Sequence, residues 1–278
     1  MPFFANLNGE IVRINFYKYE GAGNDFIMID NRTLGFVPEI ALVNRMCDRH
    51  FGIGADGLIL LENDPEFDFS MRYFNADGNE GTMCGNGGRC IVWFAKNSGI
   101  DKPEFTFNAI DGLHKAAILQ ETGNESIVKL KMIDVDEVKK MGKPESYQGH
   151  FVDTGSPHFL VEVDDVDGLD VFNEGRKIRY SPAFKEVGVN VNFIQRKQNE
   201  IKIRTYERGV ENETLACGTG SVAAALTVMF LDGKLKALIN IKARGGDLKV
   251  YAQKAKSGYV DIWLEGPAKC VFKGEINI

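Results

Sequence analysis

The stretch "GTMCGNGGRC" (residues 81–90) places a cysteine directly before a Gly-x-Gly turn, at the head of an apolar run. A second stretch, "TLACGTGSVA" (residues 214–223), repeats this arrangement in the second half of the chain. Repetition of one unusual local pattern is the first sign of an internal duplication, which decides the architecture of the whole chain. We therefore compare the sequences around Cys84 and Cys217.

Further landmarks recur in the same order on both sides of the two cysteines. Asn75 lies nine residues before Cys84, and Glu207 lies ten residues before Cys217. "GAGNDFIMID" has a counterpart in "DTGSPHFLVEVD", and "FGIGADGLILL" in "VGVNVNFIQ". Each half ends its apolar run at a glycine, Gly99 or Gly233. Agreement in order, spacing and residue type predicts two homologous halves, joined near residues 123–127.

Local patterns assign elements within each half. Short alternating segments such as "INFYKYE", "GLILLE", "IKIRTYE" and "YVDIWLE", separated by Gly, Asn and Asp, are typical of strands. Residues 88–99 and 220–233 are predicted helices that end at a glycine. Both are apolar on most faces, which indicates burial all round. A strand-rich half with one wholly buried helix indicates a sheet curled about that helix. Residues 38–52 add an amphipathic helix.

Bulk composition limits the functional classes. The 278 residues are 44% hydrophobic and 26% charged, as in a globular protein that can bury a core. The net charge of −6 makes nucleic acid a poor partner. The longest apolar run, residues 222–231, is too short to span a bilayer, so no membrane association is expected. The N-terminus lacks the features of a secretion signal, and we expect it to be a short disordered extension before the pattern begins near Ile11.

Cysteine usage separates two residues from the other three. The odd count of five argues against a secreted disulfide scaffold and favours the cytoplasm. No spacing in the sequence is typical of a metal site, and no cofactor is expected. Cys47, Cys90 and Cys270 are expected to be small buried apolar side chains, which is the ordinary role of a lone cysteine.

A cysteine at the first turn of a helix lies where unpaired backbone N–H groups converge. That position lowers the thiol pKa from about 8.5, and the same N–H groups can bind a carboxylate. With the two halves related by a pseudo-two-fold, a substrate in the cleft between them would have one sulfur on each face of its α-carbon. One thiolate would remove the α-proton and the opposite thiol would return a proton, which inverts the stereocentre without a cofactor. A redox-active cysteine pair is the rival interpretation.

The longer phrases "FNADGNEGTMCGNGGRC", "YERGVENETLACGTGSVAA", "GAGNDF" and "DRHFGIGADGL" resemble diaminopimelate epimerases, over about residues 14–278. The resemblance implies a cofactor-independent epimerase that interconverts LL- and meso-2,6-diaminopimelate, in lysine and peptidoglycan precursor synthesis. The fold that the resemblance implies is α/β (α+β), with two pseudo-symmetric halves, each a mixed, barrel-like β-sheet wrapped around a central buried helix. It also implies that the last strand returns to the first half. The expected domains are residues 1–124 plus 268–278, carrying Cys84, and residues 125–267, carrying Cys217. A homodimer is a further expectation.

Site residues follow from the same resemblance. Cys84 and Cys217 would be the acid/base thiols, assisted by His158, which tunes thiol protonation, and Glu207, which lies near a thiol or an amino group. The main chain at Gly85–Asn86 and at Gly218–Thr219 would hold the reacting carboxylate. The remaining substrate contacts would come from Asn24, Asn75, Ser156, Asn190, Glu207 and Arg208, of which Asn75, Asn190 and Arg208 would recognise the distal, non-reacting end.

Two positions depart from the pattern of well-known members. Ser156 stands where an asparagine is common, and Gly57 where a glutamine is common. A serine reaches less far than an asparagine, and a glycine can offer only its backbone. Three alternatives therefore stay open: a racemase of another amino acid with the same two cysteines, a relative that only binds a ligand, and the redox pair.

Overall fold

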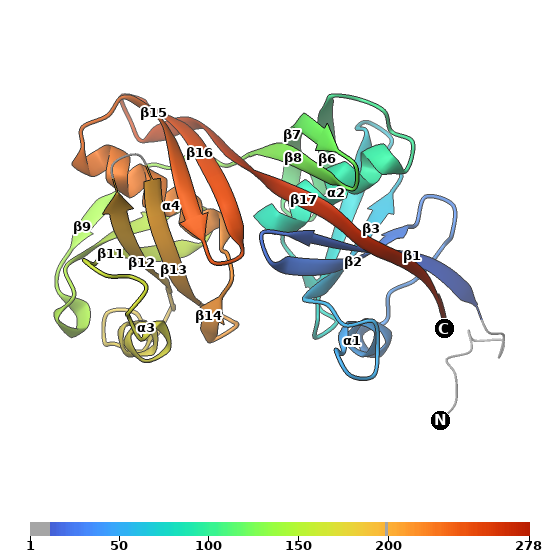
Figure 1. Cartoon of the computed structure of the whole chain (residues 1–278), viewed down its shortest axis with the longest axis horizontal. Helices are drawn as coiled ribbons and strands as arrows, with labels where there is room; N and C mark the ends of the chain where they lie inside the picture. Colours follow the sequence, from blue (N-terminus) through green and yellow to red (C-terminus); the bar gives the residue numbers. More distant parts are fainter. Residues whose placement is uncertain (1–11, 198–199) are drawn as a thin grey trace. The chain divides into compact units, whose positions relative to one another are not determined.

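The computed structural model describes residues 12–197 and 200–278. The predicted N-terminal extension, with the start of the pattern at Ile11, lies outside the described residues. The chain divides into two compact units, Met1–Val128 with Ala268–Ile278 and Lys129–Pro267, which we call the N-terminal and C-terminal units (Figure 1).

The N-terminal unit is a mixed sheet that closes on itself. Its strands are β1 (Arg13–Gly21), β2 (Asn24–Asp30), β3 (Gly57–Glu62), β4 (Phe69–Asn75), β5 (Glu80–Gly81), β6 (Glu104–Ala109) and β7 (Gly112–Thr122), with parts of β8 (Glu125–Lys131) and β17 (Tyr259–Asn277). The pairs β2–β3 and β4–β6 are parallel, and their neighbours are antiparallel. Strand β8 pairs with β17, and β17 pairs with β1, so the sheet returns to its first strand.

The C-terminal unit repeats this order. Its own strands are β9 (Lys139–Met141), β10 (Gly149–Asp153), β11 (Pro157–Glu162), β12 (Asn190–Lys197), β13 (Glu200–Glu207), β14 (Asn212–Thr214), β15 (Lys236–Ala243) and β16 (Gly246–Lys254). Here β11–β12 and β13–β15 are the parallel pairs. A short 3₁₀ turn, η1, covers Pro144–Ser146. The predicted mixed sheet in each half is confirmed.

The strand registers of the two units also coincide. Phe26 is paired with Gly57 across the parallel β2–β3 pair, and His158 is paired with Asn190 across β11–β12. Across the next strand pair, Ile59 faces Tyr73 in the N-terminal unit, and Asn192 faces Thr205 in the C-terminal unit. Equivalent positions therefore differ by 132 or 133 residue numbers along the strands, which confirms the predicted duplication.

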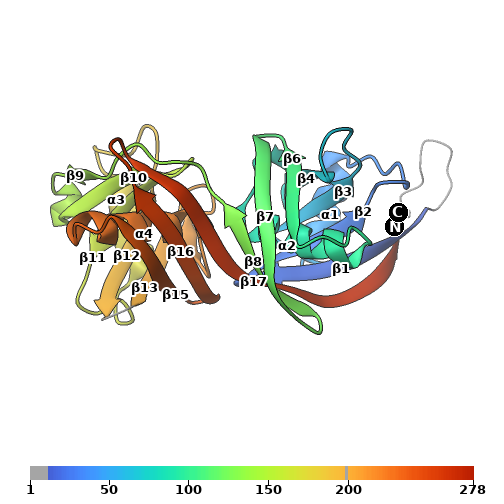
Figure 2. The ribbon, with the colours of Figure 1, turned by 90° about the horizontal axis from the view of Figure 1, so that it is seen from above.

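One buried helix runs inside each sheet. Helix α2 (Gly85–Asn97) contacts β1, β2, β3, β4 and β7, and helix α4 (Gly218–Leu231) contacts β10–β13, β15 and β16. Figure 2 shows α4 lying against these strands. Gly99 and Gly233 follow the last turns with positive φ of 96° and 63°, the conformation that glycine adopts most readily. The predicted central helices and their glycine ends are confirmed.

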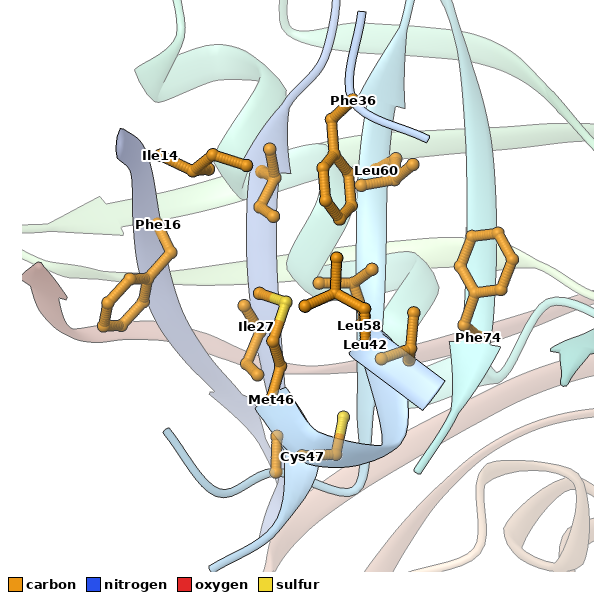
Figure 3. Close-up of a cluster of buried hydrophobic side chains, with 13 residues drawn as sticks. Ile14, Phe16, Ile27, Phe36, Leu42, Met46, Cys47, Leu58, Leu60 and Phe74 are labelled. Atoms are coloured by element: carbon orange, nitrogen blue, oxygen red, sulfur yellow. The ribbon is translucent and has the colours of Figure 1, made fainter. Parts of the chain in front are cut away.

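A second helix packs on the outside of each sheet. Helix α1 (Ile40–Cys47) covers a cluster of buried apolar side chains from β1–β4, and Cys47 belongs to that cluster (Figure 3). Helix α1 is shorter than the predicted 38–52 because Asp48 is already extended. Helix α3 (Val171–Arg179), which we did not predict, covers the equivalent cluster of the C-terminal unit. Cys90 is buried as predicted, whereas Cys270 is partly exposed, so that prediction is wrong.

Candidate active site

Cys84 is the N-cap residue of α2. Its backbone is extended, with φ −86° and ψ 133°, and the helix begins at the next residue. The carbonyl of Cys84 accepts the first helical hydrogen bond from the N–H of Gly88 at 2.7 Å. The thiol is half-buried. It lies at the positive end of the helix dipole, beside the first N–H groups of the helix, as predicted for a cysteine in this motif.

A buried polar cluster lies below this helix start. Arg89 is 0% exposed and donates to the carbonyl of Gly85 at 3.0 Å and to Oδ1 of Asn86 at 2.8 Å. Nδ2 of Asn86 donates in turn to Oδ1 of Asn24 at 2.5 Å. Burial lowers the pKa of Arg89, while the charges of Cys90, Cys84 and Glu20 act in the opposite direction. The structure therefore joins the predicted residues Asn24 and Asn86 to the turn of Cys84.

Asn24 and Asn75 come from different parts of the same unit. Nδ2 of Asn24 donates to the Asp56 carboxylate at 2.8 Å, so its amide is held from both ends. Asn75 ends β4 with an exposed side chain, and its Oδ1 accepts from the Tyr73 hydroxyl at 2.9 Å. A Cβ on Gly81 would lie 2.9 Å from Nδ2 of Asn75, so this amide lies against the hairpin that leads to Cys84.

The same cross-strand ion pair supports the hairpin that leads to each cysteine. Arg72 on β4 makes a bidentate pair with Glu80 on β5, with both N···O distances 2.9 Å. Arg204 on β13 pairs in the same way with Glu213 on β14, at 2.7 and 2.8 Å. Two parallel N–H···O bonds fix the relative orientation of two side chains better than one bond does. These pairs hold strands that precede Cys84 and Cys217 in equivalent positions.

Cys217 is the N-cap residue of α4, with φ −119° and ψ 115°. It is 9% exposed, and its Sγ accepts from the N–H of Gly220 at 3.4 Å and lies 3.4 Å from the Thr219 hydroxyl. A Cβ on Gly220 would lie 2.4 Å from Oδ1 of Asn192, so a larger residue there would have to displace the Asn192 side chain. Close packing therefore favours the second glycine of this Gly-x-Gly motif.

His158 lies within hydrogen-bonding distance of the Cys217 loop. It is 0% exposed, with Nε2 3.0 Å from Oγ1 of Thr219 and Nδ1 3.0 Å from Nδ2 of Asn192. Burial lowers the pKa of His158 to about 3, and the positive charge of Arg208 acts in the same direction, so the ring is neutral near pH 7. The structure therefore brings the predicted residues His158, Thr219 and Cys217 together.

A second group of predicted residues gathers around Asn190. Its Nδ2 donates to the Ser156 hydroxyl at 2.9 Å and to the carbonyl of Pro157 at 3.1 Å. Its Oδ1 accepts from the backbone N–H of Arg208 at 2.9 Å. The Arg208 guanidinium donates to the carbonyl of Val187 at 3.1 Å. Ser156 therefore holds the Asn190 amide, which is a task that its short side chain can perform.

Glu207 ends β13 beside the strand that leads to Cys217. Its Oε2 accepts from the Thr214 hydroxyl at 2.8 Å.

The unusual Gly57 has a packing reason, because a Cβ there would lie 2.5 Å from the carbonyl of Phe74 and 2.6 Å from the ring of Tyr73. In this chain Tyr73 occupies the space that a larger residue at position 57 would need.

Two buried polar residues near the cysteines escaped the sequence analysis. Arg89 stands inside the apolar run of the first predicted helix, and Asn192 stands inside the apolar strand "NVNFIQ". For Arg89 the available signal was a charged residue in a helix predicted to be buried all round, and for Asn192 it was a polar residue between apolar neighbours of a strand, because burial requires a hydrogen-bonding partner.

Each unit thus offers a thiol at a helix N-terminus with backbone donors beside it, which suits proton transfer next to a bound carboxylate. Within residues 12–197 and 200–278, no group of three His, Cys, Asp or Glu side chains is placed to hold a metal ion. Among those same residues, none of the helices combines the length and the apolar character needed to cross a membrane.

Comparison with known proteins agrees with the duplication. The family model described as diaminopimelate epimerase matches residues 16–137 and again residues 150–271. The diaminopimelate epimerase of Flavobacterium psychrophilum is 49% identical over 94% of this chain and 99% of the relative. That of Chlorobaculum tepidum is 45% identical over 93% and 99%. A crystal structure of a Bacillus anthracis phenazine biosynthesis protein of the PhzF family shares the fold, with a TM-score of 0.74, 18% identity and coverage of 96% and 100%.

Proposed function

The chain belongs to the diaminopimelate epimerase family, and from this premise we propose that it interconverts LL- and meso-2,6-diaminopimelate by proton exchange between two thiols. The observation that carries the proposal is the repeated N-cap cysteine, Cys84 on α2 and Cys217 on α4, in a chain that matches the family along nearly its whole length.

The proposed reaction removes one proton from the α-carbon of the substrate and adds another to it. A thiolate takes the α-proton of the substrate, and the electron pair of the broken C–H bond moves into the adjacent carboxylate. The second thiol gives its proton to the opposite face of the carbon, so the two sulfurs exchange protonation states. Backbone N–H groups at Gly85–Asn86 and Gly218–Thr219 are the proposed donors to the carboxylate, whose charge increases in the intermediate. Inversion needs two groups of similar pKa, which explains two cysteines.

Recognition of the distal amino-acid end is assigned to three polar residues. Asn75 and Asn190 offer amides, and Arg208 offers a forked donor suited to a carboxylate. The bonds of Asn190 to Ser156 and to the Arg208 backbone support this assignment, because they fix the amide and the start of the Arg208 side chain. The proposal further places the enzyme in the cytoplasm, in accord with its free thiols, and as a homodimer.

The test follows exchange in heavy water. Incubation with LL-diaminopimelate in D₂O should introduce deuterium at the α-carbon and produce the meso isomer. Cys84→Ala and Cys217→Ala should each reduce turnover by at least about a thousandfold, since each removes a proton-transfer group. Cys270→Ala, a cysteine at the partly exposed surface of β17, is the matched control and should keep wild-type turnover. Exchange with another amino acid but not with diaminopimelate would overturn the substrate assignment, and an active Cys217→Ala would overturn the two-thiol mechanism.

A further inference from the structure

A row of buried polar side chains leads through the C-terminal unit to the sulfur of Cys217. Thr205 on β13, Asn192 on β12 and His158 on β11 are 3%, 0% and 0% exposed. The row continues through the Thr219 hydroxyl, 3.0 Å from His158, to Cys217, 3.4 Å from that hydroxyl. Buried polar groups of this kind are costly unless each has a partner, so the row needs an explanation.

The orientation of Asn192 is fixed by two neighbours. The backbone carbonyl of Asn190 can only accept, so the atom 3.3 Å from it must be the amide nitrogen Nδ2. The Asn192 oxygen then faces Thr205 and accepts from its hydroxyl at 2.9 Å. With this orientation Nδ2 donates to Nδ1 of His158, which therefore carries no proton.

The remaining directions follow from His158. A neutral ring with an unprotonated Nδ1 carries its hydrogen on Nε2 and donates it to the Thr219 oxygen. That oxygen accepts from His158, which leaves the hydrogen of Thr219 available to the sulfur of Cys217. With the N–H of Gly220, the sulfur then has two donors that stabilise its thiolate.

The duplicated fold supplies an internal control for this arrangement. By strand register, Phe26, Ile59 and Tyr73 occupy in the N-terminal unit the positions of His158, Asn192 and Thr205. The same fold is therefore built with two apolar residues at the positions of the histidine and the asparagine. The buried polar row is not a requirement of the fold, and its end at Cys217 points to a role there.

We propose that Asn192 is a positioning residue, which holds His158 as the Nε2–H tautomer so that the Thr219 hydroxyl donates to Cys217 and favours its thiolate. The inference rests on the proposed function in one respect, since it takes Cys217 as a proton-transfer thiol. Thr205 has the supporting task of orienting the Asn192 amide.

The first experiment reads the tautomer without substrate. In ¹⁵N-labelled protein, the His158 ring should show an unprotonated Nδ1 and a protonated Nε2 throughout about pH 5–9, with His158→Gln identifying its resonances among the four histidines. A proton on Nδ1, or a doubly protonated ring at neutral pH, would overturn the proposal. This measurement uses the wild-type chain, so it does not depend on whether a variant folds.

The second experiment titrates Cys217 through the shift of its labelled Cβ. Asn192→Asp and Thr219→Val should each raise the apparent pKa of Cys217 by about one unit, which is about a tenfold smaller thiolate fraction. Thr219→Ser should restore the wild-type value, because it keeps the hydroxyl. Thr227→Val, on the same helix with its hydroxyl bonded to the carbonyl of Ala223, is the matched control and should leave the titration unchanged.

A double variant separates the relay from the negative charge that Asn192→Asp introduces. If Asn192 acts through the hydroxyl, Asn192→Asp should raise the pKa less in a Thr219→Val background than in the wild type. Equal shifts in both backgrounds, or unchanged titrations in both single variants, would overturn the relay. None of these measurements uses diaminopimelate, so a failed substrate assignment leaves them decisive, and a failed relay leaves the deuterium exchange result standing.

Discussion

The loops of Cys84 and Cys217 share their scaffold and differ in what lies beneath it. Both cysteines are N-caps of a buried helix, and both are preceded by a strand pair locked by a bidentate Arg–Glu bridge. Below Cys84 the buried polar group is Arg89, which comes from the helix itself. In the C-terminal unit the helix carries Val222 at that position and the small buried Ser221 beside it, while His158 and Asn192 come from the sheet. The two units therefore share their geometry and differ in the buried polar side chains that lie near each cysteine.

The two cysteines also differ in the charge of their buried neighbours. A buried guanidinium carries a full positive charge near Cys84, whereas the imidazole near Cys217 is neutral. A positive charge stabilises a thiolate over a longer range than a hydroxyl, which must touch the sulfur. The two thiols thus have electrostatically different neighbours.

The largest effect should come from removing that charge. Arg89→Met is expected to raise the pKa of Cys84 by about 1–3 units, the range found when a close charge partner is lost. Val222→Met introduces the same side chain at the equivalent position of the C-terminal unit but removes no charge. A titration of Cys217 in this variant should give a pKa near the wild-type value. If the pKa of Cys84 is unchanged in Arg89→Met, the charge of Arg89 does not stabilise the Cys84 thiolate.

An intermediate effect should separate the two Gly-x-Gly turns. At Gly220 an added Cβ would lie 2.4 Å from Oδ1 of Asn192, whereas at Gly87 it would lie 3.0 Å from the end of the Ile59 side chain. Gly220→Ala should therefore lower the free energy of unfolding by about 1–3 kcal/mol. Gly87→Ala should cost less than about 1 kcal/mol, because Ile59 can shift and alanine favours the helix. Urea unfolding of both variants measures the difference, and equal losses would contradict it.

The smallest effect concerns acid stability through the Arg–Glu bridges. Burial would raise the pKa of Glu213, but the hydrogen bonds from Arg204 outweigh it and hold the pKa below its usual value. The Arg72 hydrogen bonds likewise lower the pKa of Glu80. A depressed folded-state pKa gives stability that is present above the unfolded value of about 4.5 and is lost as the pH falls through the folded value.

Urea unfolding between about pH 3 and pH 7 should show that the free energy of unfolding decreases as the pH falls. Glu213→Gln should reduce this pH dependence more than Glu80→Gln does. Glu213 is the less exposed partner, with its side chain 12% exposed against 29% for Glu80, so solvent screens its bridge less. If the free energy of unfolding depends on pH equally in the two variants, solvent screens both bridges alike and the prediction is wrong.

The sequence predicted the features that depend on repetition and local chemistry. The duplication, the two buried helices and the N-cap position of Cys84 and Cys217 follow from glycine spacing and apolar runs. Helix α3 was missed because its nine residues include four charged ones and a central glycine, which weaken the apolar pattern. Strand β17 was predicted only to residue 265 and extends to Asn277, because its second part alternates weakly and is fixed by pairing with β1.

The contacts around the cysteines depend on residues that are distant in sequence. Asn86 meets Asn24, and Thr219 meets His158, only because strands and helix starts converge. Nothing in a single sequence indicates that Gly57 is required by the ring of Tyr73, or that Asn192 faces Thr205. These pairings become visible only with the strand register.

Strand β17 also determines which residues each unit needs before its sheet can close. Its last part, Ala268–Ile278, belongs to the N-terminal unit, and Val12 and Ile278 exchange both of their backbone hydrogen bonds. The edge of β1 therefore has no partner from β17 until the segment that follows both units has been synthesised. The C-terminal unit, whose residues are contiguous, can complete its sheet earlier. The half of the protein that is translated first thus needs the last residues of the chain to complete its sheet.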